Sequence, residues 1–360
     1  MQLYTKPEAV ILSYPLRSLG HPDDFLFFDI ETTGLTPANA QVYLIGALSH
    51  EEGSGWTLRQ WFAESLTDEE EMLRDFFAFA GRFRTLVHYN GDTFDIPFLM
   101  RCALQYGIGH PFAGLSSLDL YRAVRPYRKI FGTERMNQKS MEVFLGLERM
   151  DRFSGGELIP VYETYIATHE KALRSRLLLH NEEDLTGLPV LLSLLSYRDF
   201  FPGAFRFLDA DDAPDALTLS FRGEVRLPKE VSFSVSPVTL RASEDTLTVR
   251  IPKYRQTMAH YFENYRDYYY LPNEDRAVHK SVGEFVDRSA RVKCTARNAC
   301  VKKDGCFLPL FGPALPDQNV FQAEYRGAVR YVEESDFRKE APVLEDYVYA
   351  VLKAAGLRDA

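Results

Sequence analysis

The stretch FLFFDIE, residues 25–31, followed directly by TTGL, decides the fold that we expect. The stretch is short and strongly apolar, which predicts a buried β-strand, and Gly34 predicts a turn after it. Asp29 and Glu31 are two residues apart, so on a strand their side chains point to the same face. Two carboxylates on one face are costly unless a cation neutralises them, and hard divalent cations prefer carboxylate oxygens. The alternative is that the strand ends here and both acids are in solvent.

The segments around this strand predict a mixed sheet flanked by helices. Residues 42–50 and 56–63 are typical of a β-hairpin, and residues 85–90 of a further strand. Apolar residues at helical spacing predict helices over 67–80 and over about 170–198. A hairpin followed by alternating strands and helices favours an α/β fold with a central sheet.

The chain length and the changes in composition and hydrophobic pattern along the sequence predict two domains. The 360 residues are 46% hydrophobic, which is enough to bury a sizeable core. We expect an α/β domain over 1–202, a linker rich in Gly, Pro and Asp over 203–215, and a β-rich α+β domain over 216–360 with a C-terminal helix. In the second domain, alternation over 216–252 predicts a β-meander, and the turn residues 303–306 predict another hairpin.

Composition excludes several classes of protein. The net charge of −9 means that the bulk field does not attract nucleic acid, so any polyanion must be bound by local basic patches, such as 122–139 and 276–303, or by bound cations. The sequence lacks an apolar run that could cross a bilayer and a secretion signal, so we expect a cytoplasmic protein without membrane association. Four cysteines are too few for a disulfide scaffold, and Cys294, Cys300 and Cys306 lack the short pairs typical of zinc sites, so their role stays open.

The segment HYNGDTFDIPFL, residues 88–99, carries a second candidate carboxylate. An apolar strand leads into Asn90, Gly91 permits a tight turn, and Asp95 stands at the entry to a helix. Ordinary capping of the helix N-terminus explains Asp95 equally well when this segment is taken alone.

The segment LLLHNEEDLTGLPVLL, residues 177–192, carries a third candidate. His180 and Asp184 are four residues apart and share one face of a helix. Gly187 and Pro189 are expected to kink or interrupt that helix just past them. Taken alone, the run HNEED is also typical of a solvated face on an apolar helix.

The three motifs, in this order, resemble those of the DEDD superfamily of 3′–5′ exonucleases, whose fold is ribonuclease-H-like. FDIETTGL is similar to the first motif, and YNGDTFDIPFL is similar to the second motif of the proofreading domains of B-family DNA polymerases. His180 and Asp184 stand where the third motif would lie. The resemblance covers about residues 23–195 and looks closest to the YprB-like, ribonuclease-H-like proteins of bacteria, which the segment 141–162 also resembles.

This resemblance implies a two-metal site that hydrolyses phosphodiester bonds. Asp29, Glu31 and Asp184 would surround one Mg²⁺ or Mn²⁺, Asp29 would bridge to a second ion, and Asp95 would support that ion. Two such ions, typically about 3.5–4 Å apart, activate a water and stabilise the leaving oxygen. His180 would act as general base or orient the water. The implied substrate is a single-stranded DNA or RNA end, and the choice between them stays open because it depends on contacts to the 2′-OH.

The position of His180 departs from the pattern of the superfamily. His180 precedes Asp184 by four residues, whereas the members that use His have five, and four is the spacing of the subgroup that uses Tyr. On a helix the difference is about 100° of rotation. His88 and Tyr89 are the alternatives for the base. The departure leaves open a catalytically weak nucleic-acid-binding protein that uses the fold as a platform. A structure-selective endonuclease, which cuts internally, is a further alternative.

Six residues are expected to contact the substrate: Thr32, Gly34, Leu35, Asn90, Arg125 and Arg128. In the resemblance, the turn after the first motif touches the terminal nucleotide, and Leu35 wedges against its base. The two arginines could flank the phosphates, or else belong to a solvated helix face. In the second domain, the tyrosines of 261–272 beside the basic segment 276–303 could stack bases of a single strand, or else form a helical packing stripe. The sequence names no protein partner.

Overall fold

A computed structural model describes every residue except 316–317 and 359–360. The chain forms two compact units, which we call the first and the second unit and describe separately. Their bounds are Met1–Asp199 with Leu227–Lys229, and Phe200–Arg226 with the chain from Glu230 onward. Among the described residues, none of the helices combines the length and the apolar character that crossing a bilayer requires.

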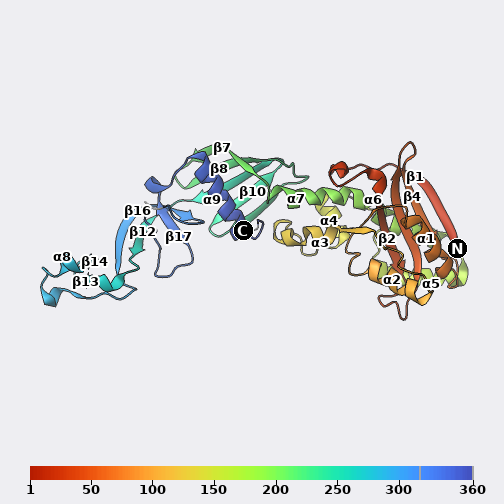
Figure 1. The fold of residues 1–360 in the computed structure, drawn as a ribbon, viewed down its shortest axis with the longest axis horizontal. Coiled ribbons are helices and arrows are strands. Elements are labelled where there is room, and N and C mark those ends of the chain that lie inside the picture. Colours follow the sequence, from red (N-terminus) through yellow and green to blue (C-terminus); the bar gives the residue numbers. More distant parts are fainter. Residues whose placement is uncertain (316–317, 359–360) are drawn as a thin grey trace. The chain divides into compact units, whose positions relative to one another are not determined.

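A six-stranded mixed sheet forms the centre of the first unit, in the order β1-β4-β3-β2-β5-β6 (Figure 1). The strands β1 to β4 pair antiparallel, and β5 and β6 continue the sheet parallel to β2. The mixed sheet predicted from the sequence is confirmed, although β1 was not predicted. The strands have these bounds: β1 (Gln2–Glu8), β2 (Phe25–Thr32), β3 (Val42–Glu51), β4 (Gly55–Phe62), β5 (Thr85–His88) and β6 (Ser116–Asp119).

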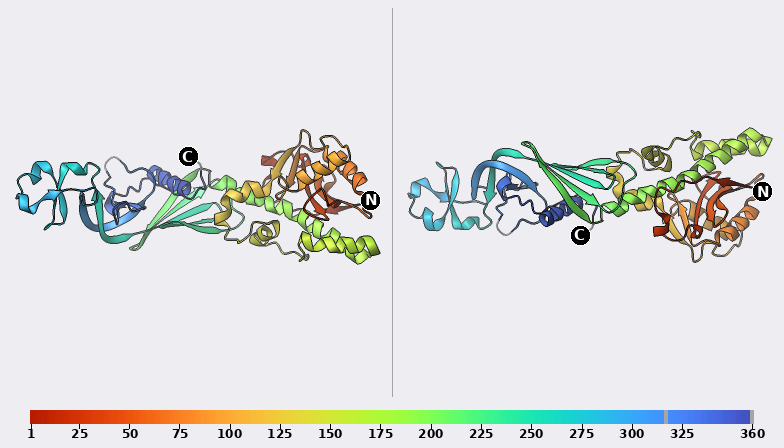
Figure 2. Two further views of the ribbon diagram at one scale, coloured as in Figure 1. Left: turned by 90° about the horizontal axis from the view of Figure 1, so that it is seen from below. Right: turned by 90° about the horizontal axis from the view of Figure 1, so that it is seen from above.

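Helices flank this sheet, and the longest of them, α6, runs alongside it as the long green helix of Figure 2. Helix α6 continues through Gly187 and Pro189, so of the predicted kink or interruption at these residues the interruption is wrong and the kink stays a prediction. Gly187 is instead a contact point, since a Cβ there would lie 2.2 Å from Oε1 of Glu142 on α4. The helices have these bounds: α1 (Glu69–Ala80), α2 (Asp95–Gln105), α3 (Leu120–Val124), the 3₁₀ helix η3 (Arg125–Ile130), α4 (Gln138–Leu145), α5 (Gly155–Thr168), α6 (Lys171–Leu191) and α7 (Leu195–Phe200).

The two faces of strand β2 differ in chemistry. Leu26, Phe28 and Ile30 belong to the main apolar core, which helix α1 shares. Asp29 and Glu31 alternate with them and therefore point to the opposite face. Helix α6 packs on that face, so the carboxylates meet α6 and not the apolar core.

Helix α6 comes close to the sheet because residue 46 of β3 is glycine. A Cβ at Gly46 would lie 2.1 Å from Oδ1 of Asn181 and 2.4 Å from Leu185. The buried amide of Asn181 accepts a hydrogen bond from Gln60 Nε2 at 3.0 Å and donates one to Oδ2 of Asp29, also at 3.0 Å. The glycine thus lets α6 reach the carboxylates of β2.

The second unit is built from three antiparallel sheets and a C-terminal helix, α9 (Figure 1). The orders of the strands are β7-β8-β11-β10-β9, β12-β16-β17 and β14-β13-β15. The elements have these bounds: β7 (Phe205–Asp212), β8 (Ala216–Gly223), β9 (Val231–Val235), β10 (Val238–Ser243), β11 (Thr246–Pro252), β12 (Tyr254–Tyr261), β13 (Tyr268–Leu271), β14 (Arg276–His279), α8 (Lys280–Gly283), β15 (Val292–Lys293), β16 (Cys300–Leu310), β17 (Arg330–Glu333) and α9 (Ala341–Ala354).

Three expectations for this unit are corrected. The expected linker 203–215 contains β7, because this segment pairs with β8. The expected turn at 303–306 lies inside the continuous strand β16, where Gly305 pairs with Gln256 of β12. The tyrosines of 261–272 do not form a helical stripe, since this segment holds the end of β12 and the strand β13.

Candidate metal centre

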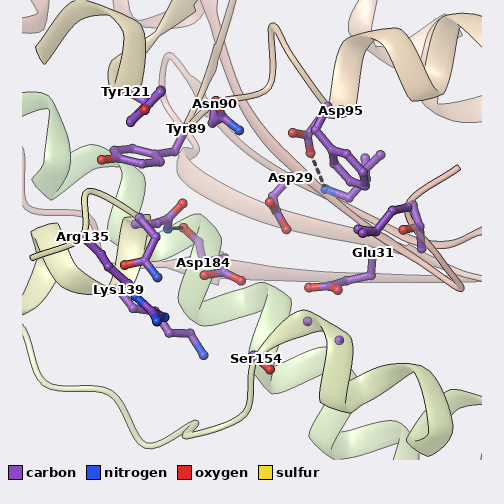
Figure 3. A pocket seen from close by; sticks show the side chains of 18 of the residues that line it. Asp29, Glu31, Tyr89, Asn90, Asp95, Tyr121, Arg135, Lys139, Ser154 and Asp184 are labelled. Carbon is purple, nitrogen blue, oxygen red and sulfur yellow. Dashed lines mark hydrogen bonds between the residues drawn. The ribbon is translucent and has the colours of Figure 1, made fainter. Parts of the chain in front are cut away.

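A cavity of about 780 Å³ opens in the first unit, and acids from three elements line it. Asp29 and Glu31 come from β2, Asp95 is the first residue of α2, and Asp184 comes from α6. Figure 3 shows the carboxylates of Asp29, Glu31 and Asp184 turned toward a common space. We call these four acids, together with His180, the cavity cluster. The structure brings together the five residues that the three sequence motifs nominated.

The carboxylates of the cavity cluster repel one another in a poorly solvated place. Burial, followed by repulsion from Asp184 and Asp95, raises the pKa values of Asp29 and Glu31 well above their usual range. Burial also raises the pKa of Asp95 to about 7, although the backbone N–H of Ile30 donates to Oδ1 of Asp95 at 3.3 Å (Figure 3). Divalent cations would relieve this repulsion, so the donor set fits a metal site.

His180 faces the carboxylates despite its four-residue spacing from Asp184. Its Nε2 lies 3.3 Å from Oε1 of Glu31 and 3.2 Å from Oδ2 of Asp184. One possible ligand atom of each of the three residues lies within 4.8 Å of the others. His180 is 3% exposed, so this contact is a buried one. The departure from the five-residue pattern therefore does not remove His180 from the site.

The segment between α4 and α5 supplies a residue that the sequence analysis missed. Nδ1 of His180 lies 2.6 Å from Oδ2 of Asp151, and Lys139 Nζ donates to the same carboxylate oxygen at 2.9 Å. Burial acts to raise the pKa of Asp151, but these two hydrogen bonds hold it below its usual value. Glu183 fixes the segment, because its carboxylate accepts the backbone N–H groups of Met150 and Asp151, each at 2.9 Å.

The same segment places a cation beside Asp184. Nη1 of Arg149 lies 2.6 Å from Oδ1 of Asp184, and Nη2 donates to Oε1 of Glu142 at 2.6 Å. The guanidinium thus occupies one oxygen of Asp184 and leaves the other, Oδ2, facing His180. Nothing in the motifs marks Arg149 or Asp151, because both reach the site through contacts that only the folded segment creates.

A second group of a histidine and two acids lies beside the cavity cluster. His88, Asp92 and Asp119, which we call the loop cluster, also have the spacing of metal ligands. Oδ1 of Asp119 accepts the backbone N–H groups of Asn90 at 2.9 Å and Arg122 at 3.1 Å, and Oδ2 accepts that of Asp92 at 3.3 Å. Because Asn90 adopts a positive φ of 68°, this cluster serves to hold its loop in place.

The alternatives for a catalytic base are engaged elsewhere. Nδ1 of His88 accepts the backbone N–H of Gly91 at 3.0 Å, and Nε2 lies 2.8 Å from Oγ of Ser117. Tyr89 lines the cavity, but its hydroxyl donates to the carbonyl of Met136 at 2.6 Å. His180 is therefore the candidate whose imidazole faces the carboxylates.

The wall of the cavity includes all six residues nominated for substrate contact: Thr32, Gly34, Leu35, Asn90, Arg125 and Arg128. Leu35 is 83% exposed. Arg125 and Arg128 are exposed on η3 and make no ion pair with any residue that the structure describes. Arg135 and Lys139 add two cations to the same wall (Figure 3).

Solved structures similar to the chain include a family B DNA polymerase from the hyperthermophilic archaeon Pyrobaculum calidifontis, with 13% identity and a TM-score of 0.41, covering 92% of this chain and 46% of that one. E. coli Exonuclease I in complex with a dA16 oligonucleotide matches with 14% identity and a TM-score of 0.28, covering 55% and 54%. Exonuclease I from Methylocaldum szegediense matches with 14% identity and a TM-score of 0.29, covering 58% and 53%. The chain therefore spans about half the length of these structures. No curated protein matches it.

A family model described as the RNase_H superfamily matches residues 26–196. The matched segment begins in β2, ends in α7 and contains all members of the cavity cluster. The fold implied by the three motifs is therefore confirmed, and residues 26–196 form a domain of the ribonuclease H superfamily.

Proposed function

We propose that the protein is a metal-dependent nuclease that hydrolyses phosphodiester bonds at single-stranded DNA or RNA ends, in the 3′–5′ direction. The observation that carries this proposal is the convergence of Asp29, Glu31, Asp95 and Asp184 on one cavity of a ribonuclease-H-like domain. The raised pKa values of Asp29, Glu31 and Asp95 support it, because bound cations would stabilise the ionised form of buried carboxylates that repel one another. The direction of cleavage rests on the resemblance of the three motifs.

The acids would divide between two Mg²⁺ or Mn²⁺ ions. Asp29, Glu31 and Asp184 would hold one ion, and Asp29 with Asp95 would hold the second. When bound, the pair of ions supplies the activation of a water and the stabilisation of the leaving oxygen in an in-line displacement at phosphorus. The chain keeps the carboxylates in place for this, since Asn181 binds Asp29 at 3.0 Å.

The wall of the cavity would orient the strand end. Arg125 and Arg128 are exposed and could neutralise phosphates as a single strand enters. Leu35 offers an exposed apolar surface for the terminal base. Attack by the oxygen of water at phosphorus would break the bond to the 3′ oxygen of the preceding nucleotide. The products would be a nucleoside 5′-monophosphate and a strand with a new 3′-hydroxyl, which takes up a proton.

The proposal is tested with single-stranded DNA and RNA oligonucleotides labelled at the 5′ end, in the presence of Mn²⁺ or Mg²⁺. We expect a ladder of progressively shortened labelled products, and its loss in Asp29→Asn. Glu182→Gln is the matched control, because Glu182 lies on the same helix as Asp184 but pairs with Lys6 at 2.7 Å, away from the cavity. This variant should cut like the wild type.

Two outcomes would replace the proposal with its rivals. Cleavage of a circular single strand would show an endonuclease, because a circle has no end. Salt-sensitive binding of oligonucleotides without metal-dependent cleavage would show a binding platform. A cytoplasmic location stays a prediction from the sequence.

A further inference from the structure

The surroundings of Nε2 in His180 have the geometry of a metal ligand. This atom lies 3.3 Å from Oε1 of Glu31 and 3.2 Å from Oδ2 of Asp184. With metal–ligand bonds of about 2.1 Å, neighbouring ligand atoms of an octahedral or tetrahedral ion are about 3.0–3.4 Å apart. The imidazole nitrogen is therefore as far from each carboxylate oxygen as two ligands of one ion would be.

In His180 and Asp184, the polar atom that faces away from the common centre is held by another residue. Nδ1 of His180 lies 2.6 Å from Asp151, and Oδ1 of Asp184 lies 2.6 Å from Arg149. Proteins commonly orient a metal-binding histidine through a hydrogen bond from its other ring nitrogen to a carboxylate. With the proton on Nδ1 directed at Asp151, the lone pair of Nε2 faces Glu31 and Asp184. Lys139 in turn fixes Asp151 at 2.9 Å.

We propose that Nε2 of His180 directly binds the divalent ion held by Glu31 and Asp184, and that this site takes a first-row transition-metal ion such as Mn²⁺ in preference to Mg²⁺. The inference rests on the metal site of the proposed function and names one of its ligands. Mg²⁺ is bound through oxygen and dehydrates reluctantly. Imidazole suits first-row transition metals, and Mn²⁺, which also accepts carboxylates, is the member of that series with the lowest affinity, so a nitrogen ligand separates it from Mg²⁺ less strongly than it separates Fe²⁺ or Zn²⁺.

This assignment replaces the role of general base that the sequence predicts for His180. With Nε2 bonded to the ion and Nδ1 hydrogen-bonded to Asp151, the imidazole has no nitrogen free to accept a proton from water. The two roles exclude each other, so an experiment that detects the bond between nitrogen and metal decides between them.

Pulsed electron paramagnetic resonance of the full-length protein loaded with Mn²⁺ tests the assignment. A directly bound imidazole gives a ¹⁴N hyperfine coupling to Mn²⁺, and we expect this coupling in the wild type. It should be replaced by a ¹⁵N coupling when only the histidines carry ¹⁵N, a result that needs no variant. His180→Gln should lose the coupling, whereas His110→Gln should keep it, because His110 is exposed and outside the cavity.

The result that overturns the inference is Mn²⁺ bound in the cavity without any coupling to histidine nitrogen. If that protein still cuts oligonucleotides, the proposed nuclease stands and only this ligand assignment falls. A protein that neither takes up Mn²⁺ nor cuts would contradict the proposed function as well.

Metal affinities give a second readout, independent of activity. His180→Gln should lower the affinity for Mn²⁺ at least about 10-fold while changing that for Mg²⁺ less, because the lost nitrogen ligand favours the transition metal. Asp151→Asn should weaken Mn²⁺ binding by about 10–100-fold as an orienting residue would, while the nitrogen coupling remains. Equal losses for Mn²⁺ and Mg²⁺ in His180→Gln would contradict a direct bond.

Discussion

The cavity cluster and the loop cluster lie in the same unit and contain the same kinds of side chain. They differ in the hydrogen-bond donors that the protein offers to their carboxylates and imidazoles. Each groups a buried histidine with acids at the spacing of metal ligands. In the loop cluster, Asp119 accepts three backbone N–H groups, and both nitrogens of His88 have partners. In the cavity cluster, the carboxylates of Asp29 and Glu31 face an open space and one another. The comparison teaches that residue types and spacing alone do not identify a metal site: backbone N–H groups bind both oxygens of Asp119, whereas Asp29 and Asp184 each have one oxygen held by a side chain and the other left toward the cavity cluster.

The pKa shifts in the two clusters also differ. Burial lowers the pKa of His88, which keeps its imidazole neutral beside Asp92 and Asp119. Burial and mutual repulsion raise the pKa values of Asp29 and Glu31 instead. We therefore expect substitutions in the cavity cluster to lower the cleavage rate more than the free energy of unfolding, and substitutions in the loop cluster to do the reverse.

The largest effect is expected for Asp29→Asn. The neutral amide should lower the rate of oligonucleotide cleavage by at least about 10³-fold, because it removes a carboxylate shared by both proposed ions. The metal-free protein should be as stable as the wild type or slightly more stable, because a repelling charge is gone. Cleavage rates and urea unfolding in the presence of a chelator measure the two effects. A strong loss of stability would mean that Asp29 is a structural residue, like those of the loop cluster.

The next effect is a change with pH in the free energy of unfolding of the metal-free protein. The pKa of Asp95 is about 7 in the folded state against 3.8 for the free side chain, so the folded state binds more protons between these values. The free energy of unfolding should therefore fall as the pH rises from about 4 to 7, by about 2–4 kcal/mol. Saturating Mn²⁺ should remove this loss, because the ion stabilises the ionised form.

Urea unfolding of the wild type and of Asp95→Asn, across this pH range and with a chelator, isolates the contribution of Asp95. The difference in unfolding free energy between the two proteins should change with pH in the stated direction. A difference that stays constant, or that favours the wild type as the pH rises, would contradict a raised pKa for Asp95.

Asp119→Asn should reverse the pattern of Asp29→Asn. The substitution should lower the free energy of unfolding by about 2 kcal/mol, because the amide group cannot accept all three N–H groups that Asp119 now accepts. The affinity for Mn²⁺ should change less than about 3-fold, because the loop cluster binds no ion in this account. Urea unfolding and calorimetric Mn²⁺ titration check the two statements. A stable variant that has lost Mn²⁺ binding would place a metal in the loop cluster.

The smallest effect is expected for Arg125→Ala and Arg128→Ala. Each should weaken binding of single-stranded oligonucleotides by about 3–10-fold, and should reduce the slope of log affinity against log salt by about 0.7, as the loss of one phosphate contact does. Lys129→Ala is the matched control, since Lys129 is exposed on the same 3₁₀ helix but does not line the cavity. An equal loss in the control would indicate a diffuse field instead of specific phosphate contacts.

Elements with a strong local pattern could be predicted from the sequence, and elements defined by pairing could not. The apolar run of β2 and the helical spacing of α1 specify their own structure. Strand β1 is polar and alternates weakly, so its existence depends on β4, with which it pairs. In β16, pairing with β12 overrides the turn preference of Asp304 and Gly305.

The same division applies to the candidate site. The members of the cavity cluster lie in three short motifs, each attached to one strand end or helix, so their order along the chain was enough to nominate them. Asp151 and Arg149 lie in a segment without regular structure, which Glu183 holds through two backbone hydrogen bonds. Their place beside His180 and Asp184 is a tertiary contact that no local spacing encodes.

An anomalous difference map from crystals grown with Mn²⁺ would locate metal ions in the first unit without any assay of activity. We expect a manganese peak among Asp29, Glu31, His180 and Asp184, and any second peak between Asp29 and Asp95. A map without a peak in the cavity, or with its peak between His88 and Asp119, would contradict this expectation.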